Sequence, residues 1–308
     1  MTALKRPAAL AIAAALLAGS LSCAAREPEP TQRTFTSPEE AVRTLIDVVK
    51  AGNMKDLLFI FGPEGESLAS SSDPATGRHN REVFTVAVAE GWQLVDLGPD
   101  KRSLVIGNEG WRFPVPIVKD GNIWRFDTAA GKEEVLARRI GRNELAVIEI
   151  CKTYVVAQRL YARDGHDGKP SGLYARTVRS DPGKQNGLYW SSKRGEKRSP
   201  LGDLMSEAAV EERAAEGEGS PFNGYYFRIL TAQGAHAPGG AKDYVVKGEM
   251  SGGFALLAWP AEYDESGVMT FMVNQDGVVH ERDLGPETGT LAKTITRYDP
   301  DQSWQPVR

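Results

Sequence analysis

The chain opens its folded part with apolar residues at helical spacing. In the segment 37–52, an apolar stripe falls three and four residues apart, at Val42, Leu45, Ile46 and Val49. Ser37 is a candidate N-cap, Glu40 completes a capping box, and Gly52 is placed to end the helix. The pattern therefore predicts a helix over 37–52, followed by a shorter helix over 54–62 and a third near 81–89.

The apolar period then changes to two. Four strands are predicted in succession, over 92–98, 103–107, 111–118 and 123–127. Pro114 and Pro116 lie two residues apart, so their missing N–H groups would face one side, which is typical of an edge strand. Helices followed by a meandering antiparallel sheet predict an α+β unit.

The second half of the chain begins with a long helix. We expect a linker up to Asn143, which would cap a helix running to about residue 165. Its apolar face is wide enough to pack on a sheet and contains Cys151, which predicts a buried, inert thiol. A polar region with a helical patch near 201–215 follows, and then four strands over 225–232, 252–260, 268–274 and 278–283.

The last two strands form the best-specified element of the sequence. Asn-Gln-Asp-Gly joins them, with Gly277 where a turn requires a positive φ. Alternation places Phe271 and Val273 on one face, toward Cys151 and Tyr154, and Thr270, Met272 and Asn274 on the other.

Two fold resemblances accompany these patterns. The N-terminal order of helices and sheet is similar to the cone-shaped fold of the nuclear transport factor 2 superfamily. The C-terminal half resembles the globular domain of type IV pilins and pseudopilins, although here the helix follows a whole domain instead of opening the chain. The positions that carry the pilin resemblance are Gln158, Tyr161, Tyr226, Pro260, Gly267, Phe271, Asp276 and Gly277.

Several stretches of the whole chain resemble a bacterial family of domains of unknown function, family 2950. They include FPVPIVKDG, WRFDTAAGKEEVLARRIGRNE, GYYFRILTAQG, GGFALLAWPAEY and GVMTFMVNQDGVV. The resemblance extends over most of residues 35–305. The resemblance implies a secreted protein and a shared fold, and it does not indicate an activity.

The N-terminus predicts export and anchoring. Lys5 and Arg6 precede a short apolar run, which is typical of a secretory signal over residues 1–22. The following GSLSCAA resembles a lipoprotein signal, so Cys23 is the predicted lipid attachment site, with cleavage to a free soluble protein as the alternative. The residue after Cys23 is Ala24 and not an aspartate, which would hold the protein at the inner membrane. The sequence therefore favours a periplasm-facing position at the outer membrane. Residues 23–34 are expected to be a tether, 35–130 an N-terminal domain and 131–308 a C-terminal domain.

Composition and charge limit the classes of partner that we expect. The chain has 308 residues, is 41% hydrophobic and carries a formal charge of −4, as an ordinary globular protein does. No long basic stripe is present in the sequence, so a nucleic-acid partner is not expected. A membrane contact through the lipid is expected, together with an envelope protein or cell-wall partner, and no cofactor is expected.

Candidate chemistry is sparse in the sequence. His79, His166, His236 and His280 lack zinc-ligand spacing, and the sequence contains no Gly-x-Ser-x-Gly elbow. Asp164 and Asp167 form a weak calcium candidate beside a helix-capping turn, and Glu262 and Asp264 are either a carboxylate pair or a solvated loop. Charged and aromatic residues suggest a partner-binding surface, against the alternatives of interdomain ion pairs and core packing: Arg125, Asp127, Arg138, Arg139, Arg142, Trp190, Trp259 and Tyr263.

These features together predict a non-catalytic envelope lipoprotein that acts as a binding or assembly factor. A hydrolase of cell-wall polymers and a carrier with a small ligand in the N-terminal cone are the alternatives. Pocket geometry distinguishes the three, since a deep cleft with convergent carboxylates, an enclosed apolar cavity and an exposed patch are different surfaces.

Overall fold

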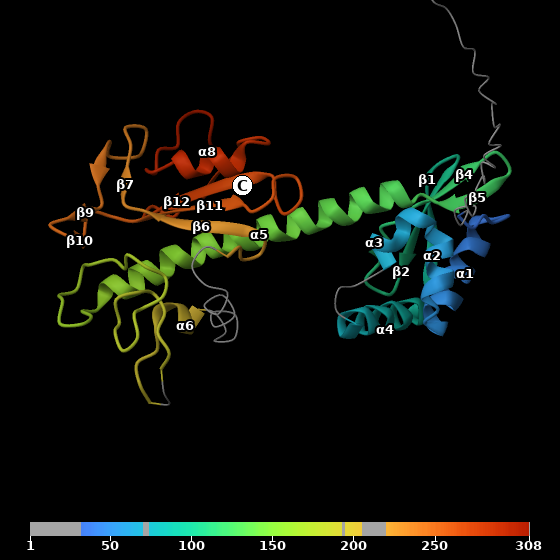
Figure 1. Ribbon diagram of the computed structural model, residues 1–308, viewed down its shortest axis with the longest axis horizontal. Helices are drawn as coiled ribbons and strands as arrows, with labels where there is room; N and C mark the ends of the chain where they lie inside the picture. The colour runs from blue at the N-terminus through green and yellow to red at the C-terminus, as the bar shows by residue number, and fades with distance from the viewer. Residues whose placement is uncertain (1–31, 70–73, 193–194, 205–219, 308) are drawn as a thin grey trace, which may run out of the picture. The chain divides into compact units, whose positions relative to one another are not determined.

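A computed structural model describes residues 32–69, 74–192, 195–204 and 220–307, and the chain divides into two compact units (Figure 1). Unit 1 ends at Thr128 and unit 2 begins at Ala129. Both units combine helices with antiparallel sheets, so the predicted α+β class is confirmed. The predicted signal, Cys23 and most of the predicted tether lie outside the described residues.

The helices of unit 1 follow the apolar pattern. They are α1 (Pro38–Ala51), α2 (Met54–Phe61), a 3-10 turn (Pro63–Gly65), α3 (Glu66–Ala69) and α4 (Pro74–Glu90). Ser37 caps α1 as predicted, by accepting from the Glu40 N–H at 3.1 Å, and Gly52 ends it with φ +66°. The Glu40 carboxylate, however, reaches back to Thr36, accepting from its N–H at 2.8 Å and its hydroxyl at 2.6 Å. The expected capping box is therefore displaced by one residue.

The sheet of unit 1 is open and antiparallel. Its path runs β1 (Trp92–Gly98), β2 (Lys101–Ile106), β4 (Ile117–Asp120) and β5 (Ile123–Phe126), while β3 (Trp111–Arg112) pairs with β2. The predicted single strand over 111–118 is wrong. Pro114 and Pro116 lie between β3 and β4, so the N–H groups that proline lacks are not needed for hydrogen bonds between strands.

Unit 2 is built on one long helix. Helix α5 spans Thr128–Arg163, so the expected linker is helical and Asn143 is not a cap. Asn143 instead donates from Nδ2 to the Ser266 carbonyl at 2.8 Å. The charged run supports the helix through i,i+4 pairing, as in the 2.8 Å contact between Glu134 and Arg138.

The main sheet of unit 2 has the order β14-β13-β12-β11-β6. The strands are β6 (Tyr225–Leu230), β11 (Ala255–Pro260), β12 (Met269–Asn274), β13 (His280–Asp283) and β14 (Gln305–Pro306). Two small ladders pair β7 (Ala232–Gln233) with β8 (Lys242–Asp243), and β9 (Val245–Val246) with β10 (Glu249–Met250). Short helices α6 (Pro200–Leu204) and α8 (Thr288–Thr294) complete the described part of the unit.

Helices cover both faces of this sheet, with α5 on one side of β6, β11 and β12 and α8 on the other (Figure 1). Phe271 and Val273 share the face of Tyr225, whose hydroxyl reaches Glu144 of α5 at 3.5 Å. On the opposite face, the Arg228 guanidinium donates to the Ala292 carbonyl of α8 at 2.6 Å. The predicted orientation of Phe271 is confirmed, whereas α8, which was not predicted, packs on the second face.

The predicted hairpin between β12 and β13 is present. The Gly277 N–H donates to the Asn274 carbonyl at 3.0 Å, and Gly277 has φ +84°. The Arg159 guanidinium of α5 donates to the Gln275 carbonyl at 2.8 Å, so the helix holds the turn. Strand β13 starts only at His280, two residues later than predicted. Cys151 is fully buried, as predicted, and burial raises the pKa of its thiol to about 12.

Candidate functional site

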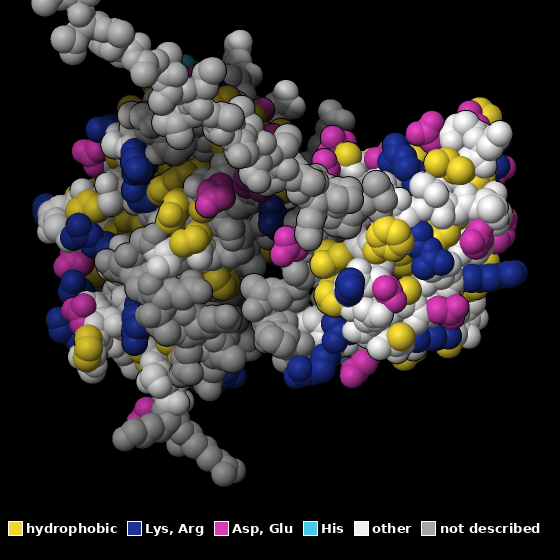
Figure 2. All heavy atoms as spheres, turned by 45° about the vertical axis from the view of Figure 1, so that its right-hand side comes forward, with side chains coloured by type: hydrophobic (Ala, Val, Ile, Leu, Met, Phe, Trp, Pro, Cys, Tyr) yellow, Lys and Arg dark blue, Asp and Glu magenta, His cyan; other side chains and the backbone are white. Residues whose placement is uncertain are grey.

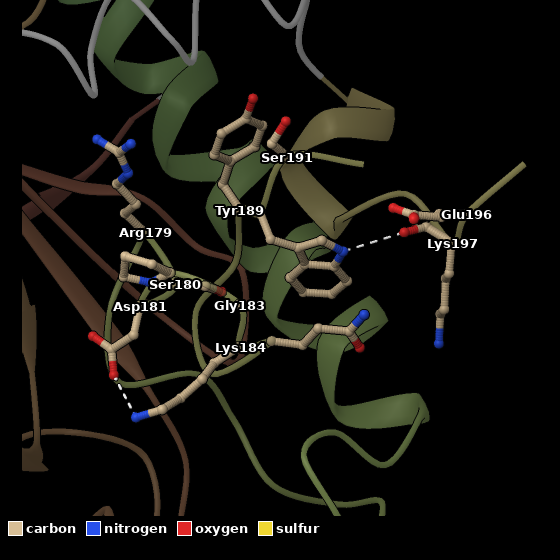
Figure 3. Close-up of a pocket in the computed structure, with 12 residues that line it drawn as sticks. Arg179, Ser180, Asp181, Gly183, Lys184, Tyr189, Ser191, Glu196 and Lys197 are labelled. Carbon is tan, nitrogen blue, oxygen red and sulfur yellow. Dashed lines mark hydrogen bonds and ion pairs between the residues drawn. The ribbon is translucent and has the colours of Figure 1, made fainter. Parts of the chain in front are cut away.

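The loops after α5 enclose a groove of about 790 Å³ in unit 2 (Figure 3). Aromatic, basic, acidic and small polar residues line it together: Arg179, Ser180, Asp181, Pro182, Gly183, Lys184, Gln185, Tyr189, Trp190, Ser191, Glu196 and Lys197. This volume lies within the range of small-ligand sites in proteins. The mixed lining distinguishes the groove from an enclosed apolar cavity.

A tight turn shapes one wall of the groove. The Lys184 N–H donates to the Asp181 carbonyl at 3.0 Å, with Pro182 at the second turn position and Gly183 at φ +77° in the third. This arrangement follows the residue preferences of a type II turn. Gly187 lies so close to Arg179 that a Cβ added at Gly187 would meet the Arg179 carbonyl carbon at 2.6 Å. The wall therefore depends on glycine at 187.

Charged side chains of the groove are held in pairs. The Asp181 carboxylate accepts from Lys184 Nζ and from Asn186 Nδ2, both at 2.9 Å. The hydrogen bond from Lys184, followed by that from Asn186, lowers the pKa of Asp181, and the same contact raises the pKa of Lys184. Both groups therefore stay ionised near neutral pH.

Trp190 is fixed by its neighbours. Its indole Nε1 donates to the Lys197 carbonyl at 3.2 Å, and the ring lies 5.5 Å from the His166 ring. His166 in turn stacks on Tyr161 of α5 at 4.1 Å between ring centroids. A series of rings thus connects the groove to the long helix, and the half-buried indole of Trp190 forms part of the lining.

A second cavity of about 420 Å³ shares Asp181 with the groove and contains both calcium candidates. Lys197 Nζ donates to the Asp164 carboxylate at 2.6 Å and thereby lowers the pKa of Asp164. Asp167 accepts from the Gln185 N–H at 3.0 Å and has φ +50°. Within the described ranges, no group of three or more His, Cys, Asp and Glu side chains is placed to hold a metal ion.

The arginine cluster predicted from sequence is divided between the units. Arg125 lies in β5 and Asp127 follows it in unit 1, whereas Arg138, Arg139 and Arg142 lie on α5 in unit 2. Arg138 pairs with Glu134, and Arg139 with Glu265 at 2.9 Å. The two pairs are exposed ion contacts on unit 2, so their contribution to stability is small.

The two other predicted aromatic residues lie apart from the groove, Trp259 in β11 and Tyr263 in the β11–β12 connection. Trp259 in β11 is 8% exposed. Its ring centroid lies 5.7 Å from that of Tyr226 and 5.4 Å from Cζ of the Arg228 guanidinium. Tyr263 donates to the Asp283 carboxylate at 3.3 Å. Of the predicted surface residues, Trp190 is the one that lines the groove.

Other residues considered for chemistry lie in structural contacts. His236 pairs with Asp299 at 3.1 Å, and His280 lies 3.2 Å from the Tyr298 hydroxyl. Glu262 and Asp264 occupy the β11–β12 connection as exposed residues. Sequence reasoning missed most of the groove lining, because loop contacts between residues 179 and 197 have no periodic pattern. The stretch Gly187–Trp190 was the available signal.

Basic and acidic side chains are interspersed over the face drawn in Figure 2, with hydrophobic side chains among them. None of the helices among the described residues has the length and apolarity needed to cross a membrane.

Comparison with known proteins identifies the family. The model of the family described as Protein of unknown function (DUF2950) matches residues 32–307. No curated protein and no solved structure matches the chain, so the likenesses to pilins and to nuclear transport factor 2 remain hypotheses from sequence. Because the matched region extends over nearly all the chain, both units included, the protein belongs to the DUF2950 family.

Proposed function

We propose that the protein is a lipid-anchored, non-catalytic binding protein of the bacterial envelope, and that the groove of unit 2 receives its partner. The anchor follows from the leader, in which an apolar run precedes Cys23. In this account, Cys23 carries lipid, residues 23–34 form the tether, and the protein faces the periplasm from the outer membrane.

The observation that carries the binding role is the ionised, paired state of two carboxylates, Asp181 in the groove and Asp164 in the adjoining cavity. A general acid requires a raised pKa at neutral pH, whereas contacts with Lys184 and Lys197 lower the pKa values of Asp181 and Asp164. Paired carboxylates and a fixed indole favour recognition over proton transfer. The hydrolase alternative requires an acid with the opposite shift.

Capture from solubilised envelope tests this role. The full chain is compared with Ser191→Leu, because Ser191 is exposed and lines the groove, so the larger side chain narrows the groove without disturbing the core. We expect the wild-type chain to retain an envelope component that Ser191→Leu loses, with no release of soluble wall fragments. Equal retention by both proteins, or steady release of fragments, would contradict the proposal.

A further inference from the structure

We infer that the ligand of the groove is a glycan chain, recognised by stacking on Trp190 and by hydrogen bonds from its hydroxyl groups to the paired side chains around it. This inference deepens the proposed function, because it names the chemical class of the envelope component. It rests on the lining of the two neighbouring cavities.

Basic and acidic side chains are equal in number across the two cavities. The groove and the adjoining cavity present five basic and five acidic side chains: Arg176, Arg179, Lys169, Lys184 and Lys197 against Asp164, Asp167, Asp181, Glu196 and Glu249. A site for a polyanion has a large excess of basic groups that concentrates anions. The groove alone has three basic and two acidic side chains, and the two cavities together have equal numbers. The balance suits an uncharged ligand with many hydroxyl groups.

Charged side chains of the two cavities are paired with one another. Lys184 contacts Asp181, Lys197 contacts Asp164, and Lys169 contacts Glu249 at 2.9 Å. Each ammonium and carboxylate retains further donor or acceptor capacity, since a carboxylate offers about four lone-pair positions. Sugar hydroxyls both donate and accept, so they can bind such pairs without leaving a charge unmatched.

The indole of Trp190 in the groove lining offers an aromatic surface for a sugar ring. One face of a pyranose ring carries C–H groups and packs on an aromatic plane, while its hydroxyls project outward. The Lys197 carbonyl and His166 hold the indole of Trp190, which reduces the loss of side-chain freedom on binding. Asp181 and Lys184 lie on one side of the lining, and Glu196 and Lys197 on the other (Figure 3).

Calorimetric titration of the purified full-length chain with an N-acetylglucosamine tetrasaccharide tests the inference. We expect binding that Trp190→Ala weakens about tenfold, in line with loss of a central aromatic contact. Trp111→Ala is the matched control, since Trp111 is 47% exposed on β3 of unit 1 and should leave the affinity unchanged. Ser191→Leu should weaken binding without truncating the indole and should melt with the wild type, so its loss of affinity cannot come from the packing that Trp190→Ala removes.

A glucose tetrasaccharide and polyglutamate complete the test. Tighter binding of the acetamido sugar assigns wall glycan, and tighter binding of the glucose sugar assigns a surface polysaccharide; both outcomes support a glycan site. No binding of either sugar, binding unaffected by both groove variants, or preferential, salt-sensitive binding of polyglutamate would overturn the inference. Envelope capture that depends on Ser191 would leave the proposed function standing after such a failure, so the two can fail separately.

Discussion

Truncation of Phe271 should destabilise unit 2 more than any surface change. Phe271 is 1% exposed, lies in the middle of β12 between Ala258 and Glu281 of the neighbouring strands, and packs 5.9 Å from Tyr225. Phe271→Ala removes a buried ring and leaves a cavity between the sheet and α5, so we expect a loss of about 3–5 kcal/mol in the free energy of unfolding. In a unit of this size, that corresponds to a fall in melting temperature of about 6–20 °C.

Scanning calorimetry of the full chain measures this effect. The two units can unfold separately, so the change is expected in one transition only. Val278→Ala is the matched control, because Val278 belongs to the same hairpin but is 45% exposed, and its loss should cost about 0.5 kcal/mol or less. A Phe271→Ala protein that melts with the wild type would refute the placement of β12 in the core.

Three further variants, one control variant and one labelling experiment test other parts of unit 2. Urea denaturation of Glu144→Ala should show a loss of about 1–3 kcal/mol in the free energy of unfolding, because the Glu144 carboxylate accepts hydrogen bonds from two backbone N–H groups, both at 2.9 Å, at the start of β12. Glu149→Ala is the control, since Glu149 is exposed and its loss should cost about 1 kcal/mol or less. Gly277→Val should lower the free energy of unfolding by about 1–3 kcal/mol because valine is strained at the positive φ of this position. Steric contact does not add to this cost, since an added Cβ meets no atom closer than 3.8 Å. A variant as stable as the wild type would contradict the turn assignment. Gly141→Ala, within α5 and with open space around it, should instead raise the melting temperature by stabilising the helix about 0.5–1 kcal/mol. Cys151 should resist alkylation at pH 8 until the protein is unfolded, because its pKa is about 12; rapid labelling of the native Cys23→Ala chain would show that the thiol is accessible.

Local patterns predicted the elements that depend on local physics. The N-cap of α1 requires a side chain such as that of Ser37, which can accept a backbone hydrogen bond. The end of α1 and the hairpin turn require a positive φ, which glycine adopts readily, and the sequence has Gly52 and Gly277 at these positions. The two-residue period predicted most strands for the same reason. The position of Cys151 within an apolar stripe likewise predicted its burial.

Elements that depend on distant partners could not be predicted in this way. Residues 128–143 are charged and contain glycine, so their pattern favoured a linker, yet the structure continues α5 through them. The capping prediction for Asn143 failed because its amide bonds to Ser266, which lies far along the chain. Helix α8 was missed because it is short and is held to the sheet by Arg228. The groove was missed for the same kind of reason, since its walls are loops joined by hydrogen bonds such as that from Tyr161 to Gln185.

The N-terminal residue of the protein in its native membrane tests the central claim most directly. Intact-mass measurement of protein extracted from host membranes should show a chain that begins at Cys23 and carries diacylglycerol, while Cys23→Ala should leave the membrane fraction. An unmodified chain that begins at any other residue would contradict a lipid-anchored envelope protein.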